Sequence, residues 1–259
     1  MHNRDEILRA AAEWAWFPRG SESENAELLL VRYPPRFGGG VRGSQVRSSG
    51  HADEVLDHAI SRTVRWGEDT LTFWTNPSDA PDLEDELRRR GARHIDTVAV
   101  FARPIDGEAA ATAPPPNGAI AELVTDLDQI RAVDAINVAV WEQLALDGDG
   151  LRAEFDELTA SLVSRTHGRV LARLDGQPVS TGGWTLADGF ARLWGAATLE
   201  EHRGRGAYRA VLAERLRIAA QWGATTALVK GRVSTSAPIL ARAGFEHYGD
   251  ERAYRLIVG

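Results

Sequence analysis

The spacing of apolar residues changes repeatedly along the chain between the two periods of regular secondary structure. Apolar residues three and four apart, which the buried side of a helix requires, recur over seven segments. These predicted helices are 3–16, 53–66, 81–90, 126–141, 151–164, 208–222 and 236–243. Shorter apolar runs, several of them alternating with polar residues, predict strands at 28–33, 45–49, 70–75, 96–103, 119–124, 170–174, 178–185, 190–198 and 225–229.

A Pro- and Ala-rich stretch at residues 106–117 interrupts this pattern. It contains three consecutive prolines and has no apolar period, as in a stiff interdomain linker. We therefore expect an N-terminal domain at 1–105, the linker at 106–117 and a second domain at 118–259. The length of 259 residues agrees with two small domains or one large one.

The two halves repeat an order of elements. Residues 53–103 run helix, Trp-Gly, strand, helix, Gly, strand, and residues 208–258 follow the same order with similar spacing. The shared order of elements indicates an internal repeat. The halves differ before their helices, because QVRSSGHA precedes the first helix, whereas Arg203-Gly204-Arg205-Gly206 precedes the second. The run Gly38-Gly39-Gly40 precedes a strand and favours a flexible hairpin loop.

The junction before the helix at 208–222 is suited to a phosphate. The first turn of a helix has backbone N–H groups without partners, and the helix dipole adds partial positive charge there. Gly204 and Gly206 let the backbone turn sharply and approach a bulky anion. Arg203 and Arg205 add charged donors that match phosphate oxygens.

This junction resembles the acyl-CoA pyrophosphate loop of the GCN5-related N-acetyltransferases (GNAT family), written Arg/Gln-x-x-Gly-x-Gly/Ala. Arg203 and Gly206 take the first and fourth positions, whereas Tyr208 replaces the usual Gly or Ala at the sixth. The following helix, strand, short helix and Gly244-Phe245 resemble the second half of the family. The resemblance implies an α+β (α/β mixed sheet) fold, with a full GNAT domain at 118–259 and a shortened GNAT-like domain before it.

The resemblance also implies a reaction, which is direct transfer of an acetyl group from acetyl-CoA to an amine. Main-chain groups of Ala196, Ala197 and Thr198 would hold the pantetheine arm. The pyrophosphate would lie on Arg203, on the N–H groups of the loop and on the start of the helix, with residues Gly204, Arg205, Gly206, Ala207 and Tyr208. Ser236 is expected either to contact the cofactor or to cap its own helix.

The sequence offers several candidates for the general acid of this reaction and no obvious general base. Where the family often places a tyrosine acid, this chain has Leu240. Tyr248 is the candidate acid, with Tyr254 and His247 as alternatives; the alternative role of Tyr248 is ring packing on an edge strand. Carboxylates at Glu142, Asp147 and Asp149 are expected to cap helices and turns or to attract a cationic amine. The side chains of Trp141, Trp184 and Trp194 are expected in the core or stacked on the acceptor.

The charge and composition of the chain argue against several classes of function. The net charge is −7 and the pI about 5.6, which argues against general nucleic-acid binding. The sequence has no cysteine, and its seven histidines form no i, i+4 pair, so we expect no metal site. It shows no signal peptide and no apolar run of about 20 residues, so we expect a cytoplasmic protein without a membrane partner.

Three functions stay open at this stage. The first is an active N-acetyltransferase with a small-molecule amine acceptor, for which both a monomer and a homodimer stay open. The second is an acyl-CoA sensor or a degenerate transferase, which the leucine at position 240 favours. The third is an interaction module without a cofactor. CoA binding separates the first two from the third, and product formation separates the first from the second.

Overall fold

The computed structural model describes residues 2–47, 51–76, 79, 82–105, 118–233 and 235–259. The predicted linker at 106–117 lies outside these residues. The chain divides into two compact units, and the boundaries differ from the expected domains. Unit 1 contains residues 1–3 and 102–229, and unit 2 contains residues 4–101 and 230–259. The C-terminal segment therefore belongs with the N-terminal half, because its strand pairs there.

Unit 1 is an α+β unit with a mixed sheet. Its elements are β6 (Ile120–Leu123), α4 (Leu127–Trp141), α5 (Gly148–Ser164), β7 (His167–Leu174), β8 (Gln177–Ala187), β9 (Phe190–Thr198), the 3-10 helix η3 (Glu200–His202), α6 (Ala207–Gln221) and β10 (Thr226–Arg232), whose last residues enter unit 2. The strand order is β10-β9-β8-β7-β6. The pair β9/β10 is parallel and the other pairs are antiparallel.

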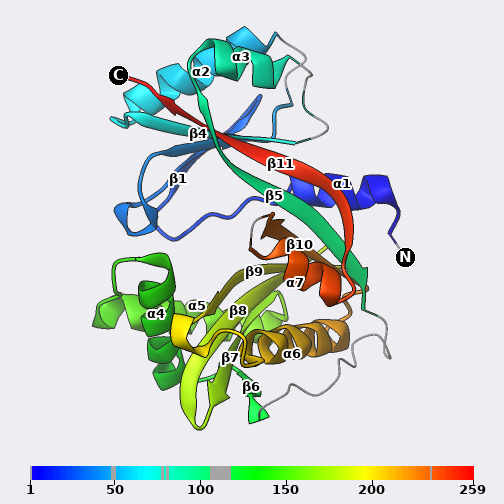
Figure 1. Ribbon diagram of the computed structural model, residues 1–259. Helices are drawn as coiled ribbons and strands as arrows, with labels where there is room; N and C mark the ends of the chain where they lie inside the picture. The colour runs from blue at the N-terminus through cyan, green and yellow to red at the C-terminus, as the bar shows by residue number, and fades with distance from the viewer. Residues whose placement is uncertain (1, 48–50, 77–78, 80–81, 106–117, 234) are drawn as a thin grey trace. The chain divides into compact units, whose positions relative to one another are not determined.

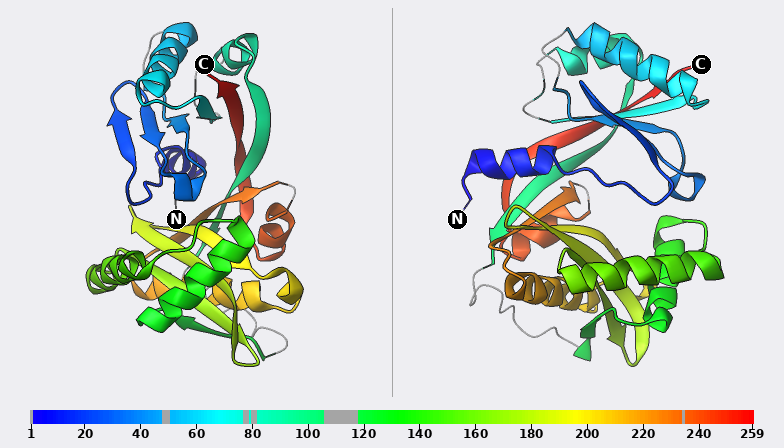
Figure 2. Two further views of the ribbon diagram at one scale, coloured as in Figure 1. Left: turned by 90° about the vertical axis from the view of Figure 1, so that its left-hand side faces the viewer. Right: turned by 180° about the vertical axis from the view of Figure 1, so that it is seen from behind.

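Helices cover both faces of the unit 1 sheet. Figures 1 and 2 show α4 and α5 on one face and α6 on the other. On the first face, Ile130, Val133 and Leu158 pack with Leu171 of β7 and Ala197 of β9. On the second face, α6 presents a nearly continuous buried side. Burying apolar groups on both faces stabilises the sheet by about 25 cal/mol per Å².

The strands of unit 2 also pair in both directions. Its elements are α1 (Arg4–Ala12), β1 (Glu22–Asn25), β2 (Leu29–Arg32), the 3-10 helix η1 (Pro35–Phe37), β3 (Val41–Ser44), α2 (Ala52–Arg65), β4 (Thr70–Thr75), α3 (Leu83–Arg89), β5 (Arg93–Pro104), which ends in unit 1, α7 (Ala237–Arg242) and β11 (Glu246–Ile257). The strand order is β1-β2-β3-β4-β11-β5. The strands β3 and β4 are parallel, and β11 runs antiparallel to β4.

Most predicted elements are present, with two differences in unit 2. The strand predicted at 45–49 is wrong for residues 45–47, because the strand is β3 at Val41–Ser44, and residues 48–49 lie outside the described residues. The glycine run leads directly into this strand, and Tyr33 N–H donates to the Gly40 carbonyl. The polar segment at 22–25 forms β1, which is an edge strand paired with β2. Its lack of apolar residues hid it, since an exposed edge strand needs no apolar side chains.

The predicted repeat of elements is confirmed. The series α2, β4, α3, β5 and the series α6, β10, α7, β11 follow the same order. The helices α2 and α6 are each followed by a Trp-Gly pair, and Gly67 and Gly223 have φ values of 74° and 96°. Only glycine adopts such angles without strain, so these two residues end their helices in the same way.

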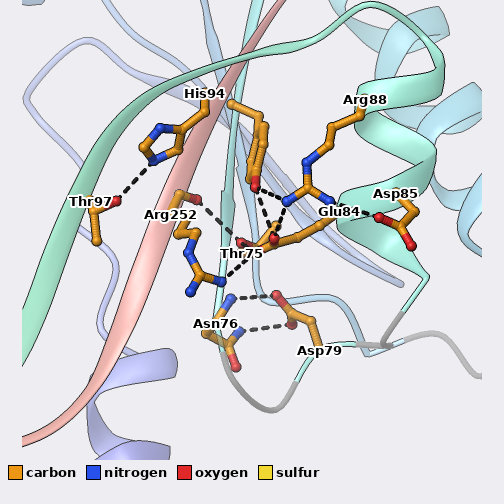
Figure 3. Close-up of polar contacts among 10 residues, drawn as sticks. Thr75, Asn76, Asp79, Glu84, Asp85, Arg88, His94, Thr97 and Arg252 are labelled. Atoms are coloured by element: carbon orange, nitrogen blue, oxygen red, sulfur yellow. Dashed lines mark hydrogen bonds and ion pairs between the residues drawn. The ribbon is translucent and has the colours of Figure 1, made fainter.

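A carboxylate network ties α3 to the sheet of unit 2. Glu84 of α3 accepts hydrogen bonds from the hydroxyls of Thr75 and Tyr254, both at 2.8 Å, and forms ion pairs with Arg88 and Arg252 (Figure 3). Burial acts to raise the pKa of Glu84, but the hydrogen bonds from Tyr254, Thr75 and Arg252 outweigh it and lower that pKa to about 2. The network therefore holds an ionised carboxylate at neutral pH.

Candidate functional site

The predicted phosphate loop connects β9 to α6 in unit 1. After β9 ends at Thr198, the 3-10 helix η3 leads into Arg203-Gly204-Arg205-Gly206, and α6 starts at Ala207. The φ angles of Gly204 and Gly206 are 75° and 91°. Both lie in the left-handed region that favours glycine, so the sharp entry into α6 depends on these two residues.

The first turn of α6 has main-chain donors without a cap. Gly206 is the N-cap residue, and no side chain caps the helix. The first hydrogen bond of the helix joins Ala210 N–H to the Gly206 carbonyl at 3.1 Å. The N–H groups of Gly206, Ala207, Tyr208 and Arg209 precede that bond, and the first turn has no acidic residue. This end of α6 therefore offers converging donors and partial positive charge to an anion.

Two exposed arginines flank these donors. Arg203 Nε donates to the Thr198 carbonyl at 3.3 Å, which holds the loop against the end of β9. Arg205 contacts His202 Nδ1 at 3.0 Å and Asp175 at 3.3 Å. The Asp175 side chain is 86% exposed, so this ion pair is weak and does not prevent Arg205 from meeting an anion.

A β-bulge interrupts β9 just before this loop. Gly183 pairs with Trp194 and Thr181 with Ala197, so Gly195 and Ala196 together oppose the single residue Gly182. Gly195 has φ = 60°, which the bulge requires. The parallel pairing of β9 with β10 covers only Phe190–Leu193, and β9 continues for five further residues. The bulged main chain of residues 195–198 is therefore available for a partner that pairs like a strand.

Arg215 of α6 lies buried behind the bulge. Its guanidinium donates to the carbonyls of Gly183 and Trp194, at 3.2 and 3.4 Å, and its Nε has no hydrogen-bond partner among the residues that the structure describes. Burial lowers the pKa of Arg215, whereas its hydrogen bond with Tyr208 acts in the opposite direction. Tyr208, which departs from the loop pattern, is thus linked to Arg215 two turns further along. Together they place a positive charge between the start of α6 and the bulge.

A polar cluster lies on the other side of the same strands. The guanidinium of Arg169 stands 4.8 Å from the ring of Trp194, and the His167 ring lies 6.2 Å from it. Trp194 Nε1 donates to Thr185 at 2.9 Å. Burial lowers the pKa of His167, and the charge of Arg169 lowers it further against the opposing effect of Glu154. Burial and the neighbouring Arg169 therefore favour the neutral form of the His167 imidazole, which has a nitrogen that can accept a proton.

Comparison with known proteins places this region in a family. Residues 135–245 match the model of the "Acetyltransferase (GNAT) family". The chain carries a GNAT-family domain. The matched segment includes the bulge, the loop and α6, and the family consists of acyltransferases. None of the curated proteins in the comparison matches the chain.

Solved GNAT structures share the fold across both units. A GCN5-related N-acetyltransferase from Kribbella flavida is 22% identical, with a TM-score of 0.71 over 96% of this chain and 94% of the other. One from Sphaerobacter thermophilus is 18% identical, with a TM-score of 0.66 over 98% and 85%. A "Tandem GNAT protein from the clavulanic acid biosynthesis pathway" is 14% identical, with a TM-score of 0.66 over 98% and 88%. The GNAT-like α+β fold is therefore confirmed.

The predicted residues near the C-terminus belong to unit 2. Tyr248 lies on β11, where its hydroxyl donates to Glu246 at 3.3 Å. Burial and the neighbouring Glu246 raise the pKa of Tyr248. Ser236 occupies the N-cap position of α7 without a side-chain cap bond. The roles of both residues stay predictions. Leu240, where the family often has a tyrosine, is buried.

The carboxylates and tryptophans separate into structural and exposed groups. Asp147 caps α5 by accepting from Gly150 N–H at 2.7 Å, and Glu142 is the left-handed C-cap of α4. Asp149 lies in the first turn of α5. Trp184 is fully buried 5.3 Å from the ring of Trp222, which is a core position, whereas Trp141 is exposed. Of these tryptophans, Trp194 belongs to the bulged strand.

Sequence reasoning missed Arg215, Gly195 and His167. A charged residue within the apolar series Val211, Leu212 and Leu216 could have drawn attention to Arg215. The positions of Gly195 and His167 in the site depend on strand pairing, which a local sequence pattern does not predict. The described part of the chain contains no group of three or more potential metal ligands. None of its helices is both long and apolar enough to cross a membrane.

Proposed function

We propose that this protein is an N-acetyltransferase that transfers the acetyl group of acetyl-CoA to a small-molecule amine. The observation that carries the proposal is the uncapped start of α6 beside the bulge of β9. One end of the site suits a diphosphate and the other suits an amide-containing arm. An acyl-CoA contains both groups in one molecule.

The residues present fit such a cofactor. The N–H groups from Arg205 to Tyr208 would hold the pyrophosphate, with Gly204 and Gly206 giving close approach and Arg203 and Arg205 adding charge. The main chain of Ala196, Ala197 and Thr198 would pair with the pantetheine arm. No carboxylate in the first turn of α6 would repel the anion.

The bound thioester would supply an activated acyl group. A main-chain N–H of the bulged segment would stabilise negative charge that develops on the carbonyl oxygen, a contribution of about 3 kcal/mol. Arg215 is a positioning residue in this scheme, because it holds the Trp194 carbonyl at the bulge. The amine must attack as a neutral nucleophile, and His167 is the proposed proton acceptor. Tyr248 stays the proposed acid.

Thermal unfolding with CoA tests the cofactor site. CoA at 100 times its Kd should stabilise the protein by about 2.7 kcal/mol. Gly206→Glu should abolish this shift, because the new carboxylate would occupy the anion position. Gly223→Glu is the matched control, since Gly223 also has a left-handed φ and follows the opposite end of α6. An unchanged shift in Gly206→Glu would remove the loop from the proposed site.

A binding protein without turnover is the second candidate. The buried Leu240 favours it, because this position provides no acid. Mass spectrometry of an amine library incubated with acetyl-CoA separates the two functions. Products heavier by one acetyl group support the transferase, and a CoA-induced thermal shift without any product supports the sensor.

A further inference from the structure

Unit 2 contains a cavity of about 270 Å³ that the proposed function does not use. It is lined at the end of the parallel pair β3/β4, by Ser44 and Gln45 on one side and by residues 74–76 on the other. The pairing of these strands ends at Gly43 and Phe73, so the backbones can separate there. Residues at the end of α1 and beyond it, from Ala12 to Trp16, also line the cavity.

A buried carboxylate in this cavity has an unsatisfied oxygen. The side chain of Glu251 on β11 is only 6% exposed, and its Oε2 forms an ion pair with Lys230 Nζ at 2.8 Å. The other oxygen, Oε1, is buried and has no hydrogen-bond partner within the described residues. Leaving a buried acceptor unpaired destabilises the folded chain. A ligand with an N–H donor would supply the missing hydrogen bond.

Arg42 is a second cation in the lining. The guanidinium carbon of Arg42 stands 3.9 Å from the centre of the Tyr33 ring. None of the ion pairs found within the described residues involves Arg42. Lys230 already pairs with Glu251, so Arg42 is the cation of the lining that is left to meet a ligand. That charge suits a carboxylate on the same ligand.

The remaining walls are largely aromatic. Trp14, Trp16, Trp74 and Tyr33 all line the cavity, together with Leu29 and Val31. Tyr33 is fixed in place, because its hydroxyl donates to the Trp16 carbonyl at 2.7 Å. Flat aromatic surfaces favour an apolar or aromatic body between the two polar ends. A cavity of this size is small for a ligand site, and acetyl-CoA would exceed it.

From this arrangement we propose that unit 2 binds a small amino acid-like ligand. Its amino group would donate to Glu251, its carboxylate would meet Arg42, and its side chain would lie among the tryptophans. This site is separate from the CoA site proposed in unit 1. Its occupation requires neither CoA nor catalysis.

Three related probes test both polar ends. L-phenylalanine has both groups, 3-phenylpropionate lacks the amine, and 2-phenylethylamine lacks the carboxylate. Titration calorimetry and tryptophan fluorescence would follow each probe without CoA. We expect L-phenylalanine to bind at least tenfold more tightly than either analogue. Failure of all three probes to bind at millimolar concentration would overturn the proposal.

Two variants test which residue binds the amino group of the ligand and which binds its carboxylate. Glu251→Gln should weaken L-phenylalanine at least tenfold and leave 3-phenylpropionate unchanged. Arg42→Met should weaken 3-phenylpropionate and leave 2-phenylethylamine unchanged. Circular dichroism checks folding, and Arg131→Met, on an exposed helix surface, is the control. Equal weakening of all three probes in both variants would indicate structural damage and contradict the assignment.

Gly206→Glu distinguishes this site from the transferase site. It should remove the CoA shift and leave L-phenylalanine binding intact. Loss of both would contradict two independent sites.

Discussion

The two repeated helices, α6 and α2, differ most at their first turns. The helix α6 begins at Gly206 with no cap and no acidic residue, and arginines precede it. The helix α2 begins after His51, also without a side-chain cap, but its first turn contains Asp53 and Glu54. Asp53 Oδ1 accepts from Glu54 N–H at 3.0 Å. The dipole of α2 is therefore balanced by its own carboxylates, whereas that of α6 is open to an external anion.

Only a few residues distinguish the two helix starts, within the same order of elements. Both helices follow a strand of a parallel pair and end in a Trp-Gly. Two carboxylates in a first turn are sufficient to repel a diphosphate, because it would meet like charges at close range. The repeat therefore preserves a framework of elements, whereas the first turn and the loop before it differ between the two helices.

The largest expected effect is on the proposed base in unit 1. His167→Gln should lower kcat about 100-fold at pH 7, because general base catalysis contributes about that factor. The thermal shift with CoA should be unchanged. Steady-state kinetics with an accepted amine would check this, and a loss of less than threefold would exclude His167 as the base.

The next effect concerns the stability of unit 2. Glu84→Gln should lower the free energy of unfolding by about 2 kcal/mol, since it removes the charge that Arg88 and Arg252 share. Asp85→Asn is the control on the same helix. Its side chain is 84% exposed, so breaking its pair with Arg88 should cost less than about 1 kcal/mol. Urea denaturation measures both, and equal losses would argue against the network.

Arg215→Met tests the buried charge that supports the bulge in unit 1. Buried charges are often replaced by apolar residues with little loss of stability. We therefore expect a similar melting temperature and about a tenfold fall in kcat, equivalent to about 1.4 kcal/mol. Unchanged turnover would show that Arg215 has no positioning role.

Asp79 should make stability depend on pH in unit 2. Burial raises its pKa to about 6 from 3.8, against hydrogen bonds from Asn76 and with the help of Glu251 and Glu84. Because the folded-state pKa is raised, the unfolding free energy should fall as pH rises from about 4 through 6. The slope is at most about 1.4 kcal/mol per pH unit. Asp79→Asn should reduce this dependence of the unfolding free energy on pH, as measured by urea denaturation at several pH values. An unchanged slope would show that another group causes the dependence.

The smallest effect comes from making α6 resemble α2. Arg209→Glu places a carboxylate in the first turn of α6, where the dipole effect is about 0.3–1 kcal/mol. CoA affinity should fall roughly two- to fivefold, with weaker dependence on salt. Conversely, Asp53→Asn with Glu54→Gln should create no CoA binding in unit 2, because no Arg-Gly loop precedes α2. Calorimetry at two salt concentrations would check both.

Local features of the fold were predictable from the sequence. Helical spacing, Trp-Gly endings and the Arg-Gly loop each act within a few residues, so one segment contains the whole signal. The start of α6 after Gly206 was found for this reason. The short strand β3 was displaced by a few residues, because the glycines before it concealed its beginning.

Long-range features were not predictable in this way. Glu251 and Lys230 meet Trp14 and Arg42 only because β11 joins the sheet of the first half. The bulge at Gly195 depends on its partner Gly182, and a single glycine in a strand pattern does not reveal that pairing. The linker at 106–117 suggested a simple division, but strand pairing assigns residues 230–259 to the other unit.

The pairing of β11 with β4 has a consequence for how the chain is made. Tyr254 lies opposite Phe73, so the ribosome adds 180 residues between the two partners. Until β11 leaves the ribosome, β4 has an open edge and the core beneath α2 lacks Tyr254 and Leu256. Folding of unit 2 must therefore wait until unit 1 has been synthesised, and this delay exposes the nascent strand to aggregation and to chaperones.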